Sequence, residues 1–361
     1  MEKISIANFR NIAFQELEFS PNINCISGNN GEGKTNLLAA IYYLSMTKSN
    51  FSSSDRYNFR HGQDSFTLCG SYRMESGLVS KISLQVDGEG KKLRRDDKPY
   101  PKISEHVGLL PIVMVSPSDT SLVSESGEER RKFVNSVLSQ MDQQYLVAAQ
   151  QYNRLLLQRN KMLKERNFAD DLMQVVDMKL AMYAQPLYEA RTRFIQQLEP
   201  IVSDYYKALS GGSEQVGIRY ESDLSKGTLD QILASRLEKD RILRYTTAGL
   251  QRDDFVFEMD GMPIRRCGSQ GQQKSFLVAL KFAQYDIMKK SYGFAPMLLL
   301  DDVFDKLDMG RISNLLGMVS SSDFGQIFIT DCNKVRLRGI VDSLTSDRTY
   351  FETAGGIFTK A

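Results

Sequence analysis

The N-terminal part of the chain changes its pattern of apolar and polar positions twice before residue 45. Residues 3–27 alternate and then become continuously apolar, which predicts two or three short strands. Residues 36–44 carry apolar side chains three or four positions apart, which predicts a helix. A glycine-rich segment, 28–35, separates the two patterns. The expected order is therefore strand, glycine-rich loop, helix.

The middle of the chain has a helical period. Apolar residues recur every three or four positions from 128 to about 165, which predicts one face of a long helix. A second series, from 172 to 198, predicts an antiparallel partner helix that Pro186 should kink or split. Strand and helix patterns alternate again afterwards. We expect an α/β lobe from residues 1–116 and 246–361, interrupted by a mainly helical second domain at 117–245.

Composition limits the possible partners and compartments. The net charge is only +2, so contacts with nucleic acid would have to come from local clusters of cations. The four cysteines form no C-x-x-C pair, which fits a reducing cytosol better than a disulfide framework. The chain shows no signal-peptide pattern and no run near the ~20 apolar residues of a membrane span. We expect a cytoplasmic protein without a membrane partner.

The glycine-rich segment is a complete phosphate-binding loop, G-x-x-x-x-G-K-[ST]. Its residues are Gly28, Asn29, Asn30, Gly31, Glu32, Gly33, Lys34 and Thr35. The backbone N–H groups of such a loop surround a β-phosphate, and the positive end of the next helix points at it. Lys34 should reach the β- and γ-phosphates, and Thr35 should ligate Mg²⁺. The sequence thus predicts ATP and Mg²⁺ as ligands.

An apolar strand at 296–300 ends in two carboxylates, Asp301 and Asp302, which is the Walker B arrangement. Asp301 is expected to hold the Mg²⁺, directly or through water. Asp302 stands where many related ATPases carry a glutamate that polarises the attacking water. Because its side chain is one methylene shorter, we expect slow hydrolysis.

Residues 269–273, Ser-Gln-Gly-Gln-Gln, match the signature motif of ABC-type ATPases and directly precede a helix. Ser269 as the N-cap would leave its hydroxyl and the first N–H groups pointing at an anion. In this architecture the motif, with Ser269, Gly271 and Gln272, would contact the nucleotide held by a second copy. Asp308, in the loop after the Walker B strand, is expected at the same dimer seam.

Four segments, one of them the signature motif, carry together with the other motifs a resemblance to the RecF family of recombination-repair ATPases, relatives of the SMC and Rad50 heads. They are Asn8-Phe9-Arg10-Asn11, Ser116-Pro117-Ser118-Asp119 with Arg130-Arg131-Lys132-Phe133, Gly249-Leu250-Gln251-Arg252-Asp253-Asp254, and Ser269-Gln270-Gly271-Gln272-Gln273-Lys274. Leu250-Gln251 departs from the usual Pro-His, and the arm helices match weakly. Thr330-Asp331 lies where transporter ATPases carry a switch histidine, and neither His61 nor His106 offers a substitute, since both are expected to be structural or surface residues.

The resemblance implies an α/β, ABC-type P-loop ATPase head with an inserted, mainly helical second domain. It implies a slow, DNA-stimulated ATPase that dimerises with ATP on DNA. It further implies that the protein helps RecO and RecR place recombinase on gapped DNA, with roles in replication restart and the SOS response.

Three basic clusters could contact DNA phosphates. They are Lys48, Arg56 and Arg60; Lys91, Lys92, Arg94 and Arg95; and, at the arm tip, Arg154, Arg159, Lys161, Lys164 and Arg166. Each could equally be a solvated face. The clusters are spread out and no helix-turn-helix accompanies them, which favours backbone binding without sequence preference and a steep loss of affinity with salt.

Other functions remain open at this point. A nucleotide-binding subunit of an ABC transporter would share the motifs, but the paired-helix insertion, Asp302 and the missing switch histidine are unusual for one. A structural clamp that binds ATP without useful turnover would also fit. A small-molecule P-loop kinase would not need the motif at Ser269.

Overall fold

The computed structural model describes residues 1–52, 54–165, 170–212, 214–304, 324–342 and 345–361. The chain forms two compact units, one of Met1–Asp119 with Leu277–Ala361 and one of Thr120–Phe276. Residues 246–276 therefore pack with the second unit, although we grouped 246–361 together from the sequence. The division into domains stays a prediction. Within the described ranges, no helix is both long and apolar enough to cross a membrane.

A mainly parallel sheet forms one layer of the first unit, with strand order β15-β14-β3-β13-β12-β8. Its bounds are β3 Ile23–Ser27, β8 Ile112–Val115, β12 Met297–Asp301, β13 Ile327–Asp331, β14 Arg348–Ala354 and β15 Ile357–Lys360. Only β15 runs antiparallel to its neighbour. Every residue of β3, β8, β12 and β13 is buried, which explains why these strands appear in the sequence as continuous apolar runs.

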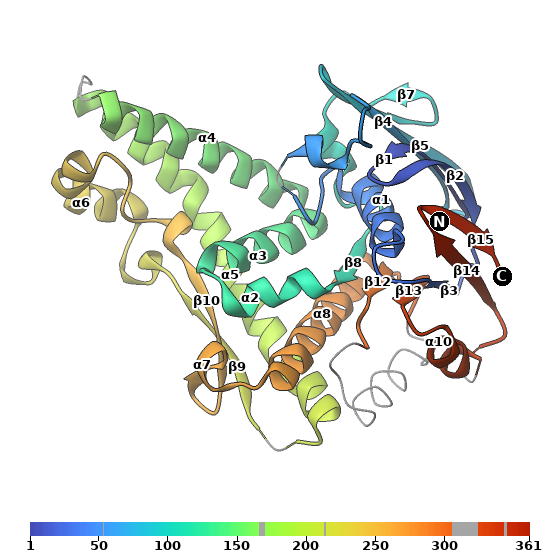
Figure 1. The fold of residues 1–361 in the computed structure, drawn as a ribbon. Coiled ribbons are helices and arrows are strands. Elements are labelled where there is room, and N and C mark those ends of the chain that lie inside the picture. The colour runs from blue at the N-terminus through green and yellow to red at the C-terminus, as the bar shows by residue number, and fades with distance from the viewer. Residues whose placement is uncertain (53, 166–169, 213, 305–323, 343–344) are drawn as a thin grey trace. The chain divides into compact units, whose positions relative to one another are not determined.

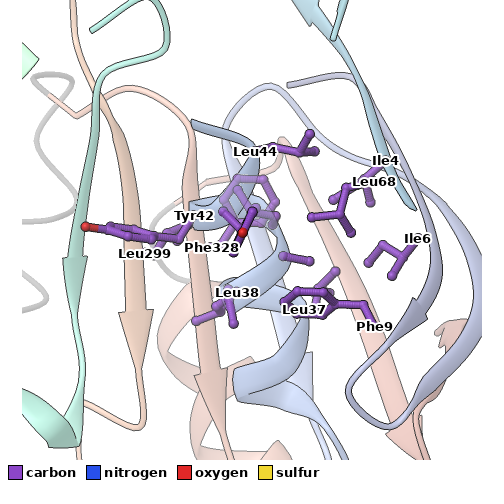
Figure 2. Close-up of a cluster of buried hydrophobic side chains, with 14 of the residues drawn as sticks. Ile4, Ile6, Phe9, Leu37, Leu38, Tyr42, Leu44, Leu68, Leu299 and Phe328 are labelled. Carbon is purple, nitrogen blue, oxygen red and sulfur yellow. The ribbon is translucent and has the colours of Figure 1, made fainter. Parts of the chain in front are cut away.

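A second, antiparallel sheet has the order β2-β1-β4-β5-β6-β7. Its strands are β1 Lys3–Phe9, β2 Ile12–Glu18, β4 Phe66–Arg73, β5 Val79–Asp87, β6 Gly90–Arg95 and β7 Lys98–Pro99. Helix α1, Lys34–Met46, contacts strands of both sheets (Figure 1). Figure 2 shows its residues Leu37, Leu38 and Tyr42 in one buried cluster with residues of both sheets. The helix is apolar nearly all round because it is covered on both sides.

Short segments complete this unit: the 3₁₀ turns Asp55–Asn58, Ile103–His106 and Pro117–Thr120, and helix α10, Lys334–Val341, which contacts β3. Helix α8, Gln270–Tyr292, begins in the second unit and ends in the first. Its described part from Phe276 onward is mostly buried.

The second unit is mainly helical. It contains α2 Ser121–Ser124, α3 Gly127–Met141, α4 Gln143–Glu165, α5 Asp170–Ser210, α6 Leu229–Leu243 and α7 Ile264–Cys267. Its sheet has the order β11-β10-β9, from Met262–Pro263, Asp254–Met259 and Val216–Glu221, with 3₁₀ turns at Asp223–Lys226 and Leu250–Arg252. Helices α4 and α5 pack along each other, as the paired periodicity predicts (Figure 1).

One detail of the helical prediction is wrong, and of the kink or split expected at Pro186 the split does not occur. The helix expected from 128 to 165 is two helices, because Asp142 adopts an extended conformation between α3 and α4. Its carboxylate accepts the N–H of Gln144 at 2.8 Å, which starts a new helix. Helix α5 is not split at Pro186, and it also continues through Pro200. A proline removes one helical hydrogen bond, and the packing of α5 on α4 and β9 compensates for that loss.

Candidate nucleotide-binding site

The phosphate-binding loop lies between β3 and α1, as expected. Gly31 and Gly33 have φ values of 85° and 111°, in the region that favours glycine. A Cβ at Gly33 would also lie 2.8 Å from Nδ2 of Asn11. Helix α1 begins directly at Lys34. The loop therefore places the N-terminus of a buried helix at the carboxyl end of a parallel strand, which is a binding site for anions.

The ammonium of Lys34 lies across this loop. Its Nζ donates to the carbonyl oxygens of Gly28 at 2.8 Å and Asn29 at 3.1 Å, and the residue is only 4% exposed. A phosphate oxygen carries negative charge and is a stronger acceptor than a carbonyl. Lys34 can therefore exchange these partners for a phosphate held by the loop.

The hydroxyl of Thr35 meets the carboxylate of Asp301. Its Oγ1 lies 3.0 Å and 2.9 Å from the two carboxylate oxygens, although the residues are far apart in sequence. Asp301 is 2% exposed, and burial raises its pKa while the hydroxyls of Thr330 and Thr35 oppose this. Among the described residues no group of three or more acidic, histidine or cysteine side chains could hold a metal. One hydroxyl and one carboxylate nevertheless suit Mg²⁺, which commonly takes few protein ligands beside phosphate oxygens and water.

A residue that the sequence analysis did not single out for this role orders the Walker B end. The hydroxyl of Thr330, at the end of β13, donates to Oδ1 of Asp301 at 2.8 Å and accepts the N–H of Asp302 at 3.0 Å. Asp302 has a φ of 45°, a left-handed conformation that aspartate tolerates better than most residues. In the sequence, the only signal for this role of Thr330 is that a polar residue stands at the end of an apolar strand.

The position of the switch histidine is occupied by an ion pair. Asp331 is 2% exposed and accepts from Nε of Arg336 at 2.9 Å and from Nη2 at 2.8 Å. Such a bidentate pair neutralises the buried carboxylate. His106 is buried instead against the carbonyl of Leu44, 2.8 Å from its Nε2, as expected of a structural residue.

The predicted helix cap is present at the signature motif. Oγ of Ser269 accepts the N–H of Gln272 at 3.3 Å, and Oε1 of Gln272 accepts the N–H of Ser269 at 2.7 Å. This reciprocal pair is a capping box. Nε2 of Gln272 also donates to Glu214 at 2.6 Å. Ser269 is exposed and Gly271 partly so, which leaves the start of α8 accessible. Asp308 lies outside the described residues.

Comparisons with known proteins agree with these motifs. A family model described as the RecF/RecN/SMC N-terminal domain matches residues 1–346. The DNA replication and repair protein RecF of Parabacteroides distasonis is 42% identical over 356 residues, or 99% of this chain and 98% of that protein. RecF of Flavobacterium johnsoniae is 40% identical over 95% of this chain and 97% of its own length. The chain belongs to the RecF family.

Solved structures show the same fold. A structure of the recombination mediator protein RecF with ATP, in the RecFOR pathway, has a TM-score of 0.89 and 29% identity, covering 100% of this chain and 97% of that one. An Smc head bound to the C-winged helix domain of ScpA has a TM-score of 0.59 at 15% identity and shares the fold alone. The expected fold class, an ABC-type head with a helical insertion, is confirmed.

The block at 249–254, which carried part of the resemblance to RecF, connects elements inside the second unit. Asp253 binds Arg191 of α5, and Asp254 forms two hydrogen bonds with Arg130 of α3, at 2.8 Å and 3.0 Å. Arg191, Arg130 and Asp253 are all buried. The two aspartates therefore fix β10 against both helices, which is a structural role.

The structure changes the basic clusters that we considered for DNA. Arg159 is fully buried, where it pairs with Asp177 at 2.7 Å and Asp240 at 2.6 Å, so it does not belong to a surface set. Lys91 is held by Asp55 at 3.1 Å. Arg94 is exposed. Arg166 lies outside the described residues. That the other cations of the three basic clusters contact DNA stays a prediction.

Proposed function

We propose that this protein is an ATPase of recombinational repair that binds DNA and dimerises when it binds ATP. The observation that carries the proposal is the contact of Thr35 with Asp301, which completes a phosphate-loop site with a buried carboxylate. Similarity to RecF proteins over nearly the whole chain supports it, as does the description of one solved relative as a complex with ATP.

Each side chain of the site has a distinct task in the proposed reaction. The loop N–H groups and Lys34 bind and orient the β- and γ-phosphates. Thr35 and Asp301 would hold Mg²⁺, which would supply charge stabilisation on the phosphate oxygens. Asp302 orients the attacking water and accepts its proton. Because aspartate is short and its backbone is fixed by Thr330, hydrolysis is slow.

ATP is proposed to join two copies of the chain. The N-terminal N–H groups of a helix lack intrahelical partners and favour an anion, and α8 begins at an exposed, capped motif. Ser269, Gly271 and Gln272 of one copy would contact the γ-phosphate bound by the other, with Asp308 at the same seam. For this contact, Gln272 must release Glu214 or reach past it.

The proposed role is in the cytoplasm, at gapped DNA. There the ATP-bound dimer helps RecO and RecR load recombinase, and it contributes to replication restart and the SOS response. The names of the relatives, DNA replication and repair protein RecF and recombination mediator protein RecF, support this assignment. Four free cysteines agree with a reducing compartment.

Light scattering with and without ATP and gapped DNA tests the switch. Wild type should double its mass with both ligands, and Ser269→Arg should stay monomeric while still binding nucleotide, because a bulky cation at the motif blocks closure sterically. Lys34→Arg should lose ATP-driven dimerisation or release from DNA. A wild-type protein that stays monomeric with ATP and gapped DNA would contradict the proposal.

The non-hydrolysing clamp is a second candidate, favoured by the short side chain of Asp302. It predicts the same dimer but no release of phosphate. Phosphate release by wild type, stimulated by DNA and abolished in Asp302→Asn, would exclude the clamp.

A further inference from the structure

The outer side of the phosphate-binding loop needs hydrogen-bond donors. In such a loop the N–H groups turn toward the phosphate, so carbonyl groups face outward and must be satisfied by other parts of the chain. The carbonyl oxygen of Glu32 shows this clearly. It accepts from the N–H of Gly356 at 2.9 Å, from Oγ1 of Thr353 at 3.2 Å and from Nδ2 of Asn11 at 3.3 Å.

Two of these donors come from the β14–β15 hairpin, Thr353 from the end of β14 and Gly356 from the turn that follows it. Gly356 has a φ of 82°, and a Cβ there would lie 2.6 Å from the backbone oxygen of Asn11. The N–H of Gly355 in the same turn donates to the carboxylate of Glu32. A Cβ at Gly28, at the start of the loop, would lie 2.6 Å from the carbonyl oxygen of Thr353. Residues 353–356 therefore lie against the start of the loop, at Gly28, and its middle, at Glu32.

The third donor comes from the turn between β1 and β2 on the other side. Oδ1 of Asn11 accepts from Nδ2 of Asn36 in α1 at 2.7 Å. Arg10 donates to Oδ1 of Asn36 at 3.1 Å and to Oδ1 of Asn58 at 3.1 Å. Asn11 thus connects the loop, helix α1 and the C-terminal turn in one polar network.

We propose that Thr353–Gly356, the end of β14 and the turn to β15, is a positioning clamp that holds the phosphate-binding loop in its nucleotide-binding conformation through Glu32. This proposal rests on the proposed function of the site as an ATP site. It adds that the C-terminal hairpin controls how well the loop binds nucleotide. The family model ends at residue 346, so it does not include the clamp. The proposed effect of the clamp is on the shape of the loop.

A pair of glycine substitutions tests the clamp. Gly356→Ala forces a Cβ against Asn11, whereas Gly77→Ala places a Cβ in open space at a φ of 79° in the β4–β5 turn. Both substitutions carry the same backbone strain. Equilibrium titration with ATP and with ADP should give dissociation constants about tenfold weaker for Gly356→Ala than for Gly77→Ala. Both nucleotides should weaken alike, because both present a β-phosphate.

A second pair covers the case in which Gly356→Ala does not fold. Thr353→Val removes the donated hydrogen bond and keeps the shape, and Thr353→Ser keeps the hydroxyl. Affinity for ADP should fall about fivefold in the valine variant and be retained in the serine variant.

Equal affinities of Gly356→Ala and Gly77→Ala, or of the two Thr353 variants, would overturn the clamp. A wild-type protein that binds neither ATP nor ADP would instead overturn the proposed function, so the two failures are distinguishable.

Discussion

The hydroxyl of Thr330 donates to the carboxylate of Asp301 across 2.8 Å, at the point where β12 and β13 pair residue against residue. The same oxygen accepts the N–H of Asp302. One threonine thus holds both the carboxylate proposed for Mg²⁺ and the left-handed backbone of the residue proposed to orient water.

Replacing Thr330 by valine should slow ATP hydrolysis more than it weakens ATP binding. The substitution keeps the shape but removes the hydrogen bonds of Thr330 with Asp301 and with the N–H of Asp302, each worth about 0.5–1.5 kcal/mol. We expect kcat to fall about tenfold or more, with the ATP dissociation constant changed less than about threefold. Thr330→Ser should restore the rate, and equal rates for the two variants would contradict this role.

Removing Arg159 should destabilise the protein strongly. Its guanidinium is buried between Asp177 and Asp240, and loss of one partner leaves buried carboxylates uncompensated. We expect Arg159→Ala to lower the free energy of unfolding by about 3–5 kcal/mol, measured by urea denaturation. Lys161→Ala in the same predicted cluster, with a side chain 74% exposed, should change it by less than about 0.5 kcal/mol. Similar losses in both variants would count against the buried network.

His106 should make the protein less stable as the pH falls. Burial lowers the pKa of His106 below its ordinary value of 6.5, while its hydrogen bond to the carbonyl of Leu44 partly opposes this. Between that lowered pKa and 6.5 the unfolded chain binds a proton that the folded chain does not. Acidification through this range therefore favours unfolding, by up to about 1.4 kcal/mol per pH unit.

Urea denaturation of His106→Gln at pH 7.5 and pH 5.5 measures this contribution. The two pH values lie about one unit above and below the ordinary pKa of histidine. The variant should lose less stability between the two values than wild type or the control His61→Gln, whose histidine is exposed. If His106→Gln loses as much stability between the two pH values as wild type does, His106 does not contribute to the pH dependence.

DNA binding should depend more on Arg94 than on Lys92, although both are exposed on β6. Lys92 already binds Asp87 at 3.4 Å and Glu89 at 3.2 Å, so its charge is partly neutralised. Arg94→Ala should weaken binding to gapped DNA and reduce the slope of log affinity against log salt by about one. Lys92→Ala should change the slope less. Fluorescence anisotropy at several salt concentrations measures both slopes, and a slope for Arg94→Ala equal to that of wild type would remove Arg94 from the DNA surface.

The sequence predicted those parts of the site that are local in the chain. The loop at 28–35 and the acidic pair at 301–302 each follow a buried strand, and parallel strands bring such ends together. For this reason the meeting of Thr35 with Asp301 was foreseeable. The roles of Thr330 and of the turn at 353–356 depend on the register between distant strands, which no local pattern records.

Charged residues were the weaker part of the prediction. Arg159 was grouped with exposed cations because helical periodicity treats arginine as polar, whereas its partners, at 177 and 240, lie on other helices. The break at Asp142 was missed because the apolar spacing of three and four residues continues across it. The signal that the sequence did offer was Asp142 itself, because aspartate is a common helix N-cap.

Strand β3, which leads into the phosphate-binding loop, pairs only with the late strands β13 and β14 among the described residues. While the protein is being synthesised, β3 leaves the ribosome long before residues 327–331 and 348–352 exist. Such distant pairings form slowly, and an unpaired apolar strand is prone to aggregate. Translation can therefore complete the nucleotide site only after residue 352 has been made, and a polypeptide interrupted before that point stays without one.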